Sequence, residues 1–325
     1  MTRNHDYSIA SIDNETLEAS KGNANAFLEA ATTEIDGAIN SITNSLATAI
    51  YGTGSGSLGR IANATFATVS LQLSDLESVV AFEVGMILVA SATDGTGTVR
   101  AGQLSIVAVN RDSGVITVDQ NISTGITAIA QNDYLFVKGD YGQKVKGLRA
   151  WLPDAAPTST PFFSVDRTSD ATRLAGIRVD GTNMPIEEAL IKAANRVARE
   201  GGKPDHVFVS FNKFNDLVNS LGAKVQYVQE QVKAGQGYVG FQTIQIHGPR
   251  GVIKVVPDRS CPSDRAFMLQ MDVWKLYSLG KCPRILDADG LKMLRDSSSD
   301  AMTVRVGYYA QLATRAPGFN ANIAL

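Results

Sequence analysis

Three glycines are the first candidates for chemistry, because their spacing is that of a phosphate-binding loop. Gly54, Gly56 and Gly59 match the pattern GxGxxG, and Asp75 follows where a ribose-binding carboxylate could lie. A dinucleotide site needs a strand before the glycines and a helix after them, so that the helix N-terminus faces the pyrophosphate. Here a helical pattern comes first and a strand-like pattern follows. We therefore interpret the glycines as a flexible helix end, and we predict no cofactor and no cofactor-binding residue.

Metal ligands and nucleophiles form no constellation in this sequence. The three histidines, His5, His206 and His247, are scattered, and no HExxH or HxH pattern occurs. Cys261 and Cys282 form no CxxC motif, so we expect two free, buried thiols. There is also no GxSxG elbow, which a serine hydrolase would use. The sequence thus predicts no catalytic residue and no metal-binding residue, and the chain is not expected to be an enzyme.

Glu187 and Glu188 are the nearest approach to a pair of catalytic carboxylates. They follow Pro185, and an apolar pattern then runs at helical spacing until Gly201. Acidic side chains in a first helical turn interact favourably with the positive end of the helix dipole. We therefore assign them to the start of a helix rather than to a reaction.

Length and composition indicate an ordinary globular chain. Its 325 residues, 44% of them hydrophobic and 19% charged, suggest two domains or one large domain with an insertion. The longest apolar stretch, Val79–Ala90, contains Glu83 and is too short to cross a membrane. The first ten residues lack the apolar segment of a secretory signal. We expect a soluble intracellular protein with no membrane partner.

Charge and proline are unevenly distributed along the chain. Residues 1–140 hold 6 basic and 15 acidic side chains, a net charge of −9, while residues 141–325 hold 24 and 17, a net charge of +7. No proline precedes Pro153. The charges could be two solvated surfaces of opposite sign, or they could attract copies of the chain to each other or to an anionic polymer. Both asymmetries predict a change of architecture near residue 150.

Periodicity in the first half predicts a helix followed by a β-module. Residues 1–20 are polar and are expected to form an arm. Between Asn25 and Ile50 apolar residues recur every three or four positions, which predicts a helix about 40 Å long. From residue 65 to 140 the pattern changes to short β-branched runs, with a hairpin across residues 111–114.

Periodicity in the second half predicts an α+β arrangement. Residues 148–180 contain Pro153, Pro157 and Pro161 and are interpreted as an extended loop. Two helices and several short strands are then expected, and the whole is placed in the α+β class. A helix is predicted over 212–221. Strands are predicted over 207–210, 239–246, 252–256, 266–271, 274–277 and 302–308.

Several motifs of the second half, taken in order, resemble those of tailed-phage major capsid proteins. The helix start Ile186-Glu-Glu-Ala-Leu190 and the stretch from Gly201 to Ser210 are similar to a helix and strand of that family. The segments Asp258–Pro262 and Arg265–Leu269, followed by Trp274, resemble its hairpin. Val304–Gly318 is similar to its last core strand.

The resemblance implies the Hong Kong ninety-seven-type capsid fold, which has a peripheral domain with a spine helix, an axial domain, an extended loop and an N-terminal arm. In the usual order the extended loop precedes the spine helix. Here either residues 186–200 or residues 27–50 supply the spine, and the greater length of the second favours it, with a possibly permuted topology. The family's lysine–asparagine cross-link cannot be assigned to any position of this sequence.

The sequence and the resemblance together predict five segments. They are an N-terminal arm (1–24), a long helix with its glycine-rich end (25–60), an inserted β-barrel- or sandwich-like module (61–147), an extended loop (148–182) and an α+β capsid core (183–325).

The function implied is that of a major capsid protein. Its copies would form pentamers and hexamers of an icosahedral shell around the double-stranded DNA of a tailed bacteriophage. The implied partners are scaffolding, portal and cement proteins, and the implied location is the virion capsid after assembly in the bacterial cytoplasm. The alternatives are a carbohydrate- or protein-binding surface module of a virion, or an enzyme with a nucleotide at Gly54–Gly59.

Overall fold

The structure is a computed structural model that describes residues 3–13, 15, 24–221, 244–287, 290–296 and 299–325. It divides into two compact units. Unit 1 consists of Met1–Ser74, Ala81–Gly147 and Leu276–Leu312, and unit 2 of Asp75–Val80, Leu148–Lys275 and Ala313–Leu325. Among the described residues, no helix is long and apolar enough to span a lipid bilayer.

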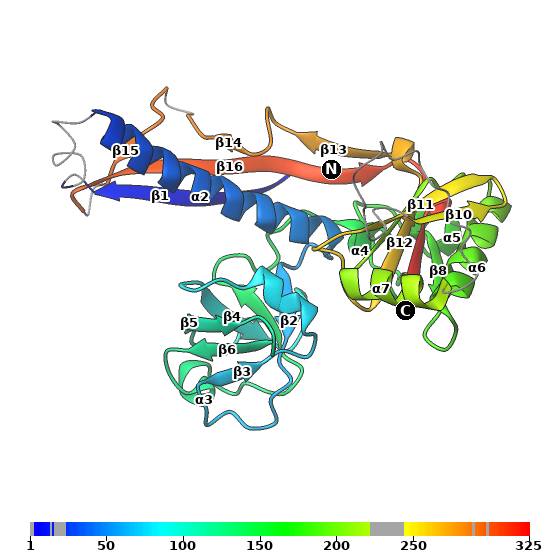
Figure 1. Cartoon of the computed structure of the whole chain (residues 1–325), viewed down its shortest axis with the longest axis horizontal. Coiled ribbons are helices and arrows are strands. Elements are labelled where there is room, and N and C mark those ends of the chain that lie inside the picture. Colours follow the sequence, from blue (N-terminus) through cyan, green and yellow to red (C-terminus); the bar gives the residue numbers. More distant parts are fainter. Residues whose placement is uncertain (1–2, 14, 16–23, 222–243, 288–289, 297–298) are drawn as a thin grey trace, which may run out of the picture. The chain divides into compact units, whose positions relative to one another are not determined.

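The first part of unit 1 is a long helix on a sheet. Helix α2, Ala24–Tyr51, has 28 residues and confirms the helix predicted over residues 25–50. Its buried positions Ala38, Ile42, Leu46 and Ala49 are spaced by three or four residues and therefore share one face. The helix has no acid in its first turn and no base in its last, so packing of this face must stabilise it. Figure 1 shows α2 beside β1, against which it packs.

The sheet under α2 is built around one long strand, β16. Its strand order is β1-β16-β13, and β14 and β15 also pair with β16. The strands are β1 Asn4–Asp13, β13 Trp274–Ser278, β14 Arg284–Ile285, β15 Leu294–Arg295 and β16 Ala301–Thr314. The last strand is thus longer than the predicted span 302–308.

The first residues differ from the expected arm. Residues 4–13 pair antiparallel with β16 over their whole length, from Asn4 opposite Ala310 to Asp13 opposite Ala301. The reason is an alternation of side chains within this polar segment. Ala10 and Ile12 are buried while Tyr7 and Ile9 point away, as successive residues of a strand must.

The second part of unit 1 is a six-stranded antiparallel β-module, here called the barrel. Its order is β2-β7-β4-β5-β6-β3. The ends of the first and last strands meet, because Ile61 bridges Leu73 and the Ala62 amide donates to the Gln72 carbonyl over 2.9 Å. The strands are β2 Ser57–Arg60, β3 Ser70–Gln72, β4 Ile87–Ser91, β5 Leu104–Asn110, β6 Val115–Val118 and β7 Tyr134–Val137, and the short helix α3, Ile122–Gly125, accompanies them. The short helix η1, Glu77–Ala81, belongs to unit 2 except for its last residue.

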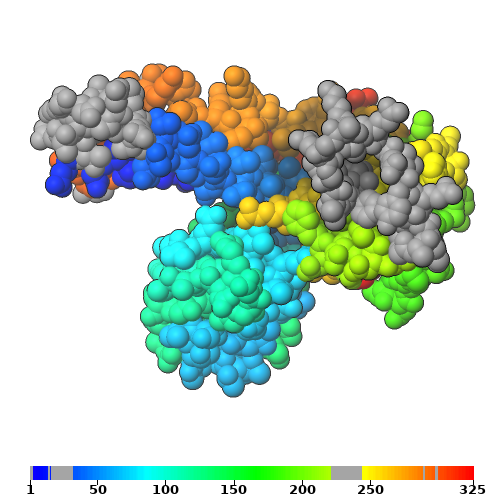
Figure 2. Space-filling model, in the orientation of Figure 1, coloured from blue at the N-terminus to red at the C-terminus, as the bar shows by residue number. Residues whose placement is uncertain are grey.

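Closure of the barrel creates an apolar interior. Leu71, Leu88, Leu104, Ile116 and Leu135 come from five different strands and are fully buried. One inward side chain from each strand is what a small barrel needs to fill itself. In Figure 2 the barrel is the cyan-to-green body, whose visible face has no deep hollow. The hairpin predicted across residues 111–114 is present as β5 and β6.

Unit 2 is an open, mixed six-stranded sheet covered by helices. Its order is β10-β11-β9-β12-β17-β8, with parallel pairs at β11–β9 and β17–β8. The strands are β8 Ile177–Asp180, β9 His206–Val209, β10 Ile244–Gly248, β11 Gly251–Pro257, β12 Arg265–Leu269 and β17 Ala321–Ala324. The helices are α4 Leu148–Trp151, α5 Ala171–Ala175, α6 Ile186–Arg199, α7 Phe211–Leu221, η3 Met271–Val273 and η4 Pro317–Phe319.

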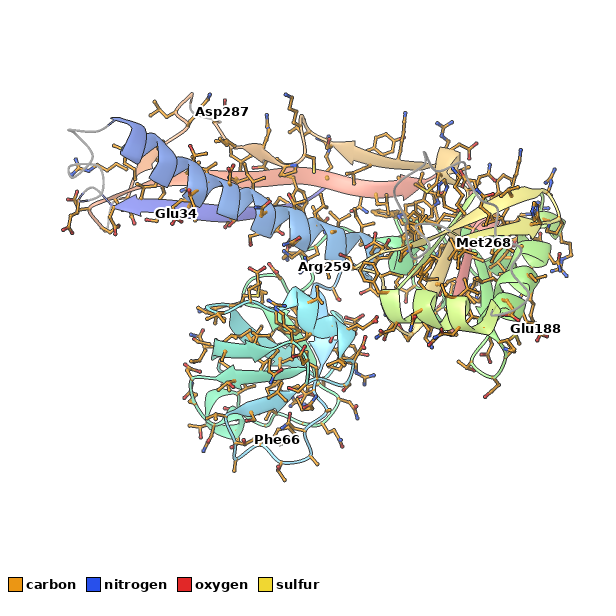
Figure 3. All side chains as sticks on the ribbon, viewed as in Figure 1. Glu34, Phe66, Glu188, Arg259, Met268 and Asp287 are labelled. Atoms are coloured by element: carbon orange, nitrogen blue, oxygen red, sulfur yellow. The ribbon has the colours of Figure 1, made fainter. Side chains whose placement is uncertain are left out.

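The core of unit 2 lies between α6, α7 and the sheet. Leu190, Ala193, Ala194 and Val197 form the apolar face of α6 and are buried, which confirms the predicted face. They pack with strand residues such as Val207 in one cluster. Figure 3 shows Met268 among the side chains around this sheet and Glu188 at its outer edge.

The second half differs from the sequence expectation in two ways, although its α+β class is confirmed. Part of the expected loop 148–182 is regular, because α4 and α5 lie in it and Ile177 and Val179 alternate as the edge strand β8. The expected core 183–325 is divided between the two units, because residues 276–312 belong to unit 1. Within that segment β14 and β15 pair with β16. Of the predicted strand 239–246, residues 239–243 lie outside the described residues.

Candidate assembly surfaces

The glycine-rich segment after α2 is a close-packed turn. A Cβ atom at Gly56 would lie 2.6 Å from the Asp140 carbonyl oxygen, and one at Gly54 would lie 2.9 Å from Lys146 Cγ. Both glycines also have positive φ, of 85° and 91°, which side-chain-bearing residues rarely adopt. Strand β2 follows the turn, so the helix that a pyrophosphate site requires is not there.

The structure keeps the sequence's reactive side chains apart. His5, His206 and His247 lie on β1, β9 and β10, and no cluster of ligands able to hold a metal ion occurs in the described part of the chain. Cys261 and Cys282 are both free. Burial raises the pKa of each thiol, that of Cys261 well above its usual value, so neither is an activated nucleophile.

Glu187 and Glu188 are in the first turn of α6, as predicted. Glu187 Oε2 accepts a hydrogen bond of 2.6 Å from Ser220 Oγ. This bond ties α7 to α6, so Glu187 joins two helices of unit 2 and does not form a pair of reacting carboxylates with Glu188.

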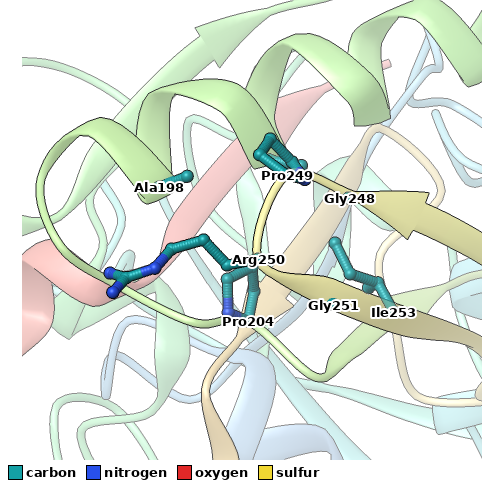
Figure 4. Close-up of a pocket in the computed structure, with 8 residues that line it drawn as sticks. Ala198, Pro204, Gly248, Pro249, Arg250, Gly251 and Ile253 are labelled. Carbon is teal, nitrogen blue, oxygen red and sulfur yellow. The ribbon is translucent and has the colours of Figure 1, made fainter.

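A small hollow in unit 2 has no room for a ligand. It is lined by the turn Gly248–Gly251, by the end of α6 and by Pro204. Figure 4 shows Pro249 and Arg250 of that turn beside Ala198 and Pro204. The hollow does not admit a water molecule, so it is a packing defect rather than a substrate pocket.

The outward face of the sheet in unit 1, here called the outer sheet face, exposes large apolar side chains. Tyr7, Ile9 and Tyr309 are 58%, 52% and 38% exposed. The His5 ring stacks on Tyr7 at 6.5 Å and lies 6.1 Å from Tyr309. A Cβ atom at Gly307, opposite Tyr7, would lie 2.7 Å from the Asp6 carbonyl oxygen. Clustered apolar side chains of this kind mark contact surfaces.

The opposite side of β1 carries a buried group of charges, here called the lysine cluster. Lys144 Nζ contacts Asp6 Oδ2, lies 2.9 Å from Asp140 Oδ2 and donates to Ser45 Oγ over 2.8 Å. Ser45 in turn donates to Asp6 over 2.8 Å. The lysine side chain is 7% exposed. The cluster therefore joins β1, α2 and the segment after β7 within unit 1.

Asp6 and Asp140 share Lys144 as their cation. The pKa values of Asp140 and of the nearby Tyr308 are both shifted. Burial raises the pKa of Asp140 in spite of the opposing pull of Lys144. Burial and then the charges of Asp6, Cys282 and Asp140 raise the pKa of Tyr308. The Tyr308 hydroxyl is buried and has no hydrogen-bond partner among the described atoms. The site is a structural tie, because it offers no exposed group to a substrate.

Residues 162–165 form a tight turn that presents aromatic side chains in unit 2. Phe162 and Val165 exchange backbone hydrogen bonds of 2.9 and 3.1 Å, and Phe163 and Ser164 have φ of 49° and 66°. Trp151 packs edge-on against Phe162 at 5.0 Å. Positive φ at a phenylalanine is a genuine outlier, and such strain concentrates at functional segments.

Sequence reasoning missed the lysine cluster and the outer sheet face. Lys144, Asp6 and Ser45 lie on three segments that are 39 to 138 positions apart in the sequence, and no spacing rule connects them. The outer face did leave a signal. Tyr7 and Ile9 alternate with the polar residues Asp6 and Ser8, a pattern typical of a strand, but the polar composition of residues 1–20 concealed it.

Residues 127–307 match the model of the SU10 major capsid protein family. No curated protein sequence matches the chain.

Solved structures of capsid chains are similar to this one. A chain of the cyanophage A-1(L) capsid asymmetric unit aligns with a TM-score of 0.54 and 13% identity, covering 99% of this chain and 77% of that one. A chain of the satellite phage P4 procapsid that includes the size determination (Sid) protein gives 0.39 and 11%, covering 99% and 70%. The first match shows that the chain has a capsid-type fold.

Proposed function

We propose that this chain forms a shell that encloses the double-stranded DNA of a tailed bacteriophage. The chain belongs to the SU10 major capsid protein family and is a coat protein whose copies form an icosahedral shell. The observation that carries the assignment is the family match over residues 127–307, more than half of the chain. These residues run through both units. Neither the match nor the fold supports the alternative of a carbohydrate- or protein-binding surface module.

The surfaces described above support assembly through contacts between copies. A shell subunit needs heterologous contacts whose rotations close around five- and six-fold axes, so we propose pentamers and hexamers. The outer sheet face, with Tyr7, Ile9 and Tyr309 exposed, and the aromatic turn at residues 162–165 are suited to such contacts because apolar side chains gain free energy when covered.

Helix α2 is the better candidate for the family's spine helix. It has 28 residues, twice the 14 of α6, and it packs against β1, which pairs along the longest strand of unit 1, β16. The assignment entails a permuted order of connections, since the barrel and the segment 148–182 come after α2 rather than before it.

The partners of the shell follow from its charge. Residues 1–140 carry a net charge of −9 and residues 141–325 a net charge of +7. The basic core would therefore face the DNA, and the acidic β-module would face outward. Scaffolding, portal and cement proteins complete the proposed assembly in the bacterial cytoplasm. No reaction is required of the chain, because surface complementarity is enough to close a shell.

The experiment that tests this function is expression of the chain in bacteria, alone and with the products of neighbouring genes, followed by sedimentation and negative-stain microscopy. We expect closed shells or rings of five and six subunits. A chain that stays monomeric in every combination would contradict the proposal. A monomer that binds glycans would favour the surface module, and a thermal shift with NAD or ATP would favour an enzyme.

A further inference from the structure

Three arginines of unit 2 lie together without an acidic partner among the residues that the structure describes. Arg167 precedes α5, Arg178 is on the edge strand β8, and Arg196 is in the last turn of α6. Arg196 Nη1 donates to the backbone oxygen of Arg178 over 2.5 Å. Burial and then the charge of Arg196 lower the pKa of Arg178, and burial and then Arg178 lower that of Arg167. These three residues are here called the arginine cluster.

No described carboxylate neutralises this cluster. Its guanidinium groups donate only to backbone oxygens, Arg167 Nη1 to Ala150 over 2.9 Å and Arg178 Nη1 to Gly176 over 3.4 Å. The Nε atom of Arg167 is buried and has no acceptor. Four other arginines of the same unit are paired with carboxylates, while the isolated Arg250 and Arg259 donate to backbone oxygens. The four pairs are Arg149–Asp154, Arg173–Asp170, Arg199–Glu200 and Arg265–Asp264.

Such an arrangement is unfavourable in an isolated subunit. Three half-buried cations lose hydration and repel each other, and a buried N–H without an acceptor loses the free energy of a hydrogen bond. The negative end of the α6 dipole stabilises a cation at Arg196. Arg167 and Arg178 lie outside α6 and do not gain this stabilisation. An oxyanion from another molecule would remove all three costs, because guanidinium groups bind carboxylates and phosphates through paired hydrogen bonds.

The recessed position of the cluster favours a carboxylate side chain over the phosphates of a duplex. All three arginines are half-buried, and Arg167 lies flat on the Phe162 ring, 4.2 Å from its centroid. A protruding aspartate or glutamate can enter such a place, whereas duplex phosphates are met by arginines and lysines that project from the surface.

We propose that the arginine cluster receives a carboxylate from residues 1–140 of a second copy of this chain. Charge complementarity identifies the donor, because those residues carry a net charge of −9 and the residues that hold the cluster carry +7. The proposal rests on the proposed function and adds to it one specific contact between subunits.

A matched pair of variants on α6 tests the contact. Arg196 belongs to the cluster, whereas Arg199 is one turn later, 70% exposed, and paired with Glu200. We expect Arg196→Glu to reduce the yield of sedimenting particles at least tenfold and Arg199→Glu to change it less than twofold. Circular dichroism and the melting temperature of the subunits serve to show that both variants fold. Equal yields from both variants would overturn the proposal.

A cross-link identifies the partner. Arg178→Lys places an amine in the cluster, and a carbodiimide then joins it to any carboxylate that touches it. Particles are assembled from equal amounts of ¹⁴N- and ¹⁵N-labelled Arg178→Lys subunits, cross-linked and digested. We expect mixed-isotope peptides that join residue 178 to a peptide from residues 1–140.

The other outcomes count against the proposal. Cross-linked peptides of one isotope only, or none, would contradict it. Arg196→Glu particles that form normally but fail to retain DNA would assign the cluster to phosphate instead. If the unaltered chain forms no particles, the proposed function is contradicted as well. If both α6 variants form normal particles, the proposed function stands and only this contact is refuted.

Discussion

The lysine cluster of unit 1 and the arginine cluster of unit 2 are both recessed groups of charge, and they differ in how they are neutralised. Lys144 is surrounded by two carboxylates and a hydroxyl of its own chain. Among the described residues, the arginine cluster has backbone oxygens and the Phe162 ring as partners but no carboxylate, and its charges repel each other. The first therefore contributes to the stability of the subunit, and the second is complete only when something else binds. Variants at the two sites should affect folding and assembly in opposite ways.

The largest effect on folding is expected from Lys144→Met. The change leaves Asp6 and Asp140 buried beside each other without a cation, which typically costs about 3–5 kcal/mol. Denaturant unfolding of the unassembled subunit measures the loss. Lys138→Met, at an exposed lysine six residues earlier in the chain, is the control and should change stability by less than about 0.5 kcal/mol. Similar losses in both variants would mean that the lysine cluster is not a stabilising tie.

A smaller effect is expected from Ser45→Ala. The serine hydroxyl accepts from Lys144 and donates to Asp6, each over 2.8 Å. Its removal takes one hydrogen-bond acceptor from Lys144 and one donor from Asp6 but keeps the ion pair between them. The free energy of unfolding is therefore expected to fall by about 1 kcal/mol. The same denaturant experiment, at constant m-value, checks it. A loss as large as that of Lys144→Met would show that the hydroxyl, and not the charge balance, holds the cluster.

The pH dependence of stability should change in Asp140→Asn. Because the pKa of Asp140 is raised in the folded state, the folded chain holds a proton that the unfolded chain has already lost. This group therefore adds stability at low pH, and that stability is lost as the pH rises from the unfolded pKa through the raised folded value. The asparagine variant should lack this component while Asp6 still neutralises Lys144. Its free energy of unfolding should therefore fall less steeply than that of the unaltered chain as the pH rises above about 4, the ordinary pKa of an aspartate. An unchanged slope would refute the assignment.

The smallest effect, and one of opposite sign, is expected from Arg178→Gln. It removes the middle charge of three that repel each other, so the unassembled subunit should keep its stability or gain up to about 0.5 kcal/mol. Thermal unfolding at low salt measures this most sensitively, because salt screens the repulsion. A clear loss of stability would show that Arg178 is neutralised within its own chain, and the contrast between the two clusters would then disappear.

The elements that local periodicity defines were predictable, and those that depend on distant partners were not. The spacing of Ile42, Leu46 and Ile50 is enough to predict α2, and that of Leu190, Ala193 and Val197 is enough to predict α6. Strand β1 was expected to be a free arm, because its pairing depends on residues almost 300 positions later. In the same way, no short motif brings Asp6 to Lys144 or Arg167 to Arg196, so both clusters became apparent only from the fold.

Closure of the barrel through the bridge between Ile61 and Leu73 has a consequence for assembly. The two edge strands of the barrel sheet, β2 and β3, are joined at their ends by this bridge and by the hydrogen bond from Ala62 to Gln72, while the other four strands have a neighbour on both sides. Little free backbone is therefore left along the sheet for another chain to pair with. Crowded, freshly synthesised subunits can therefore meet through side chains with little tendency to add strands to each other's barrels.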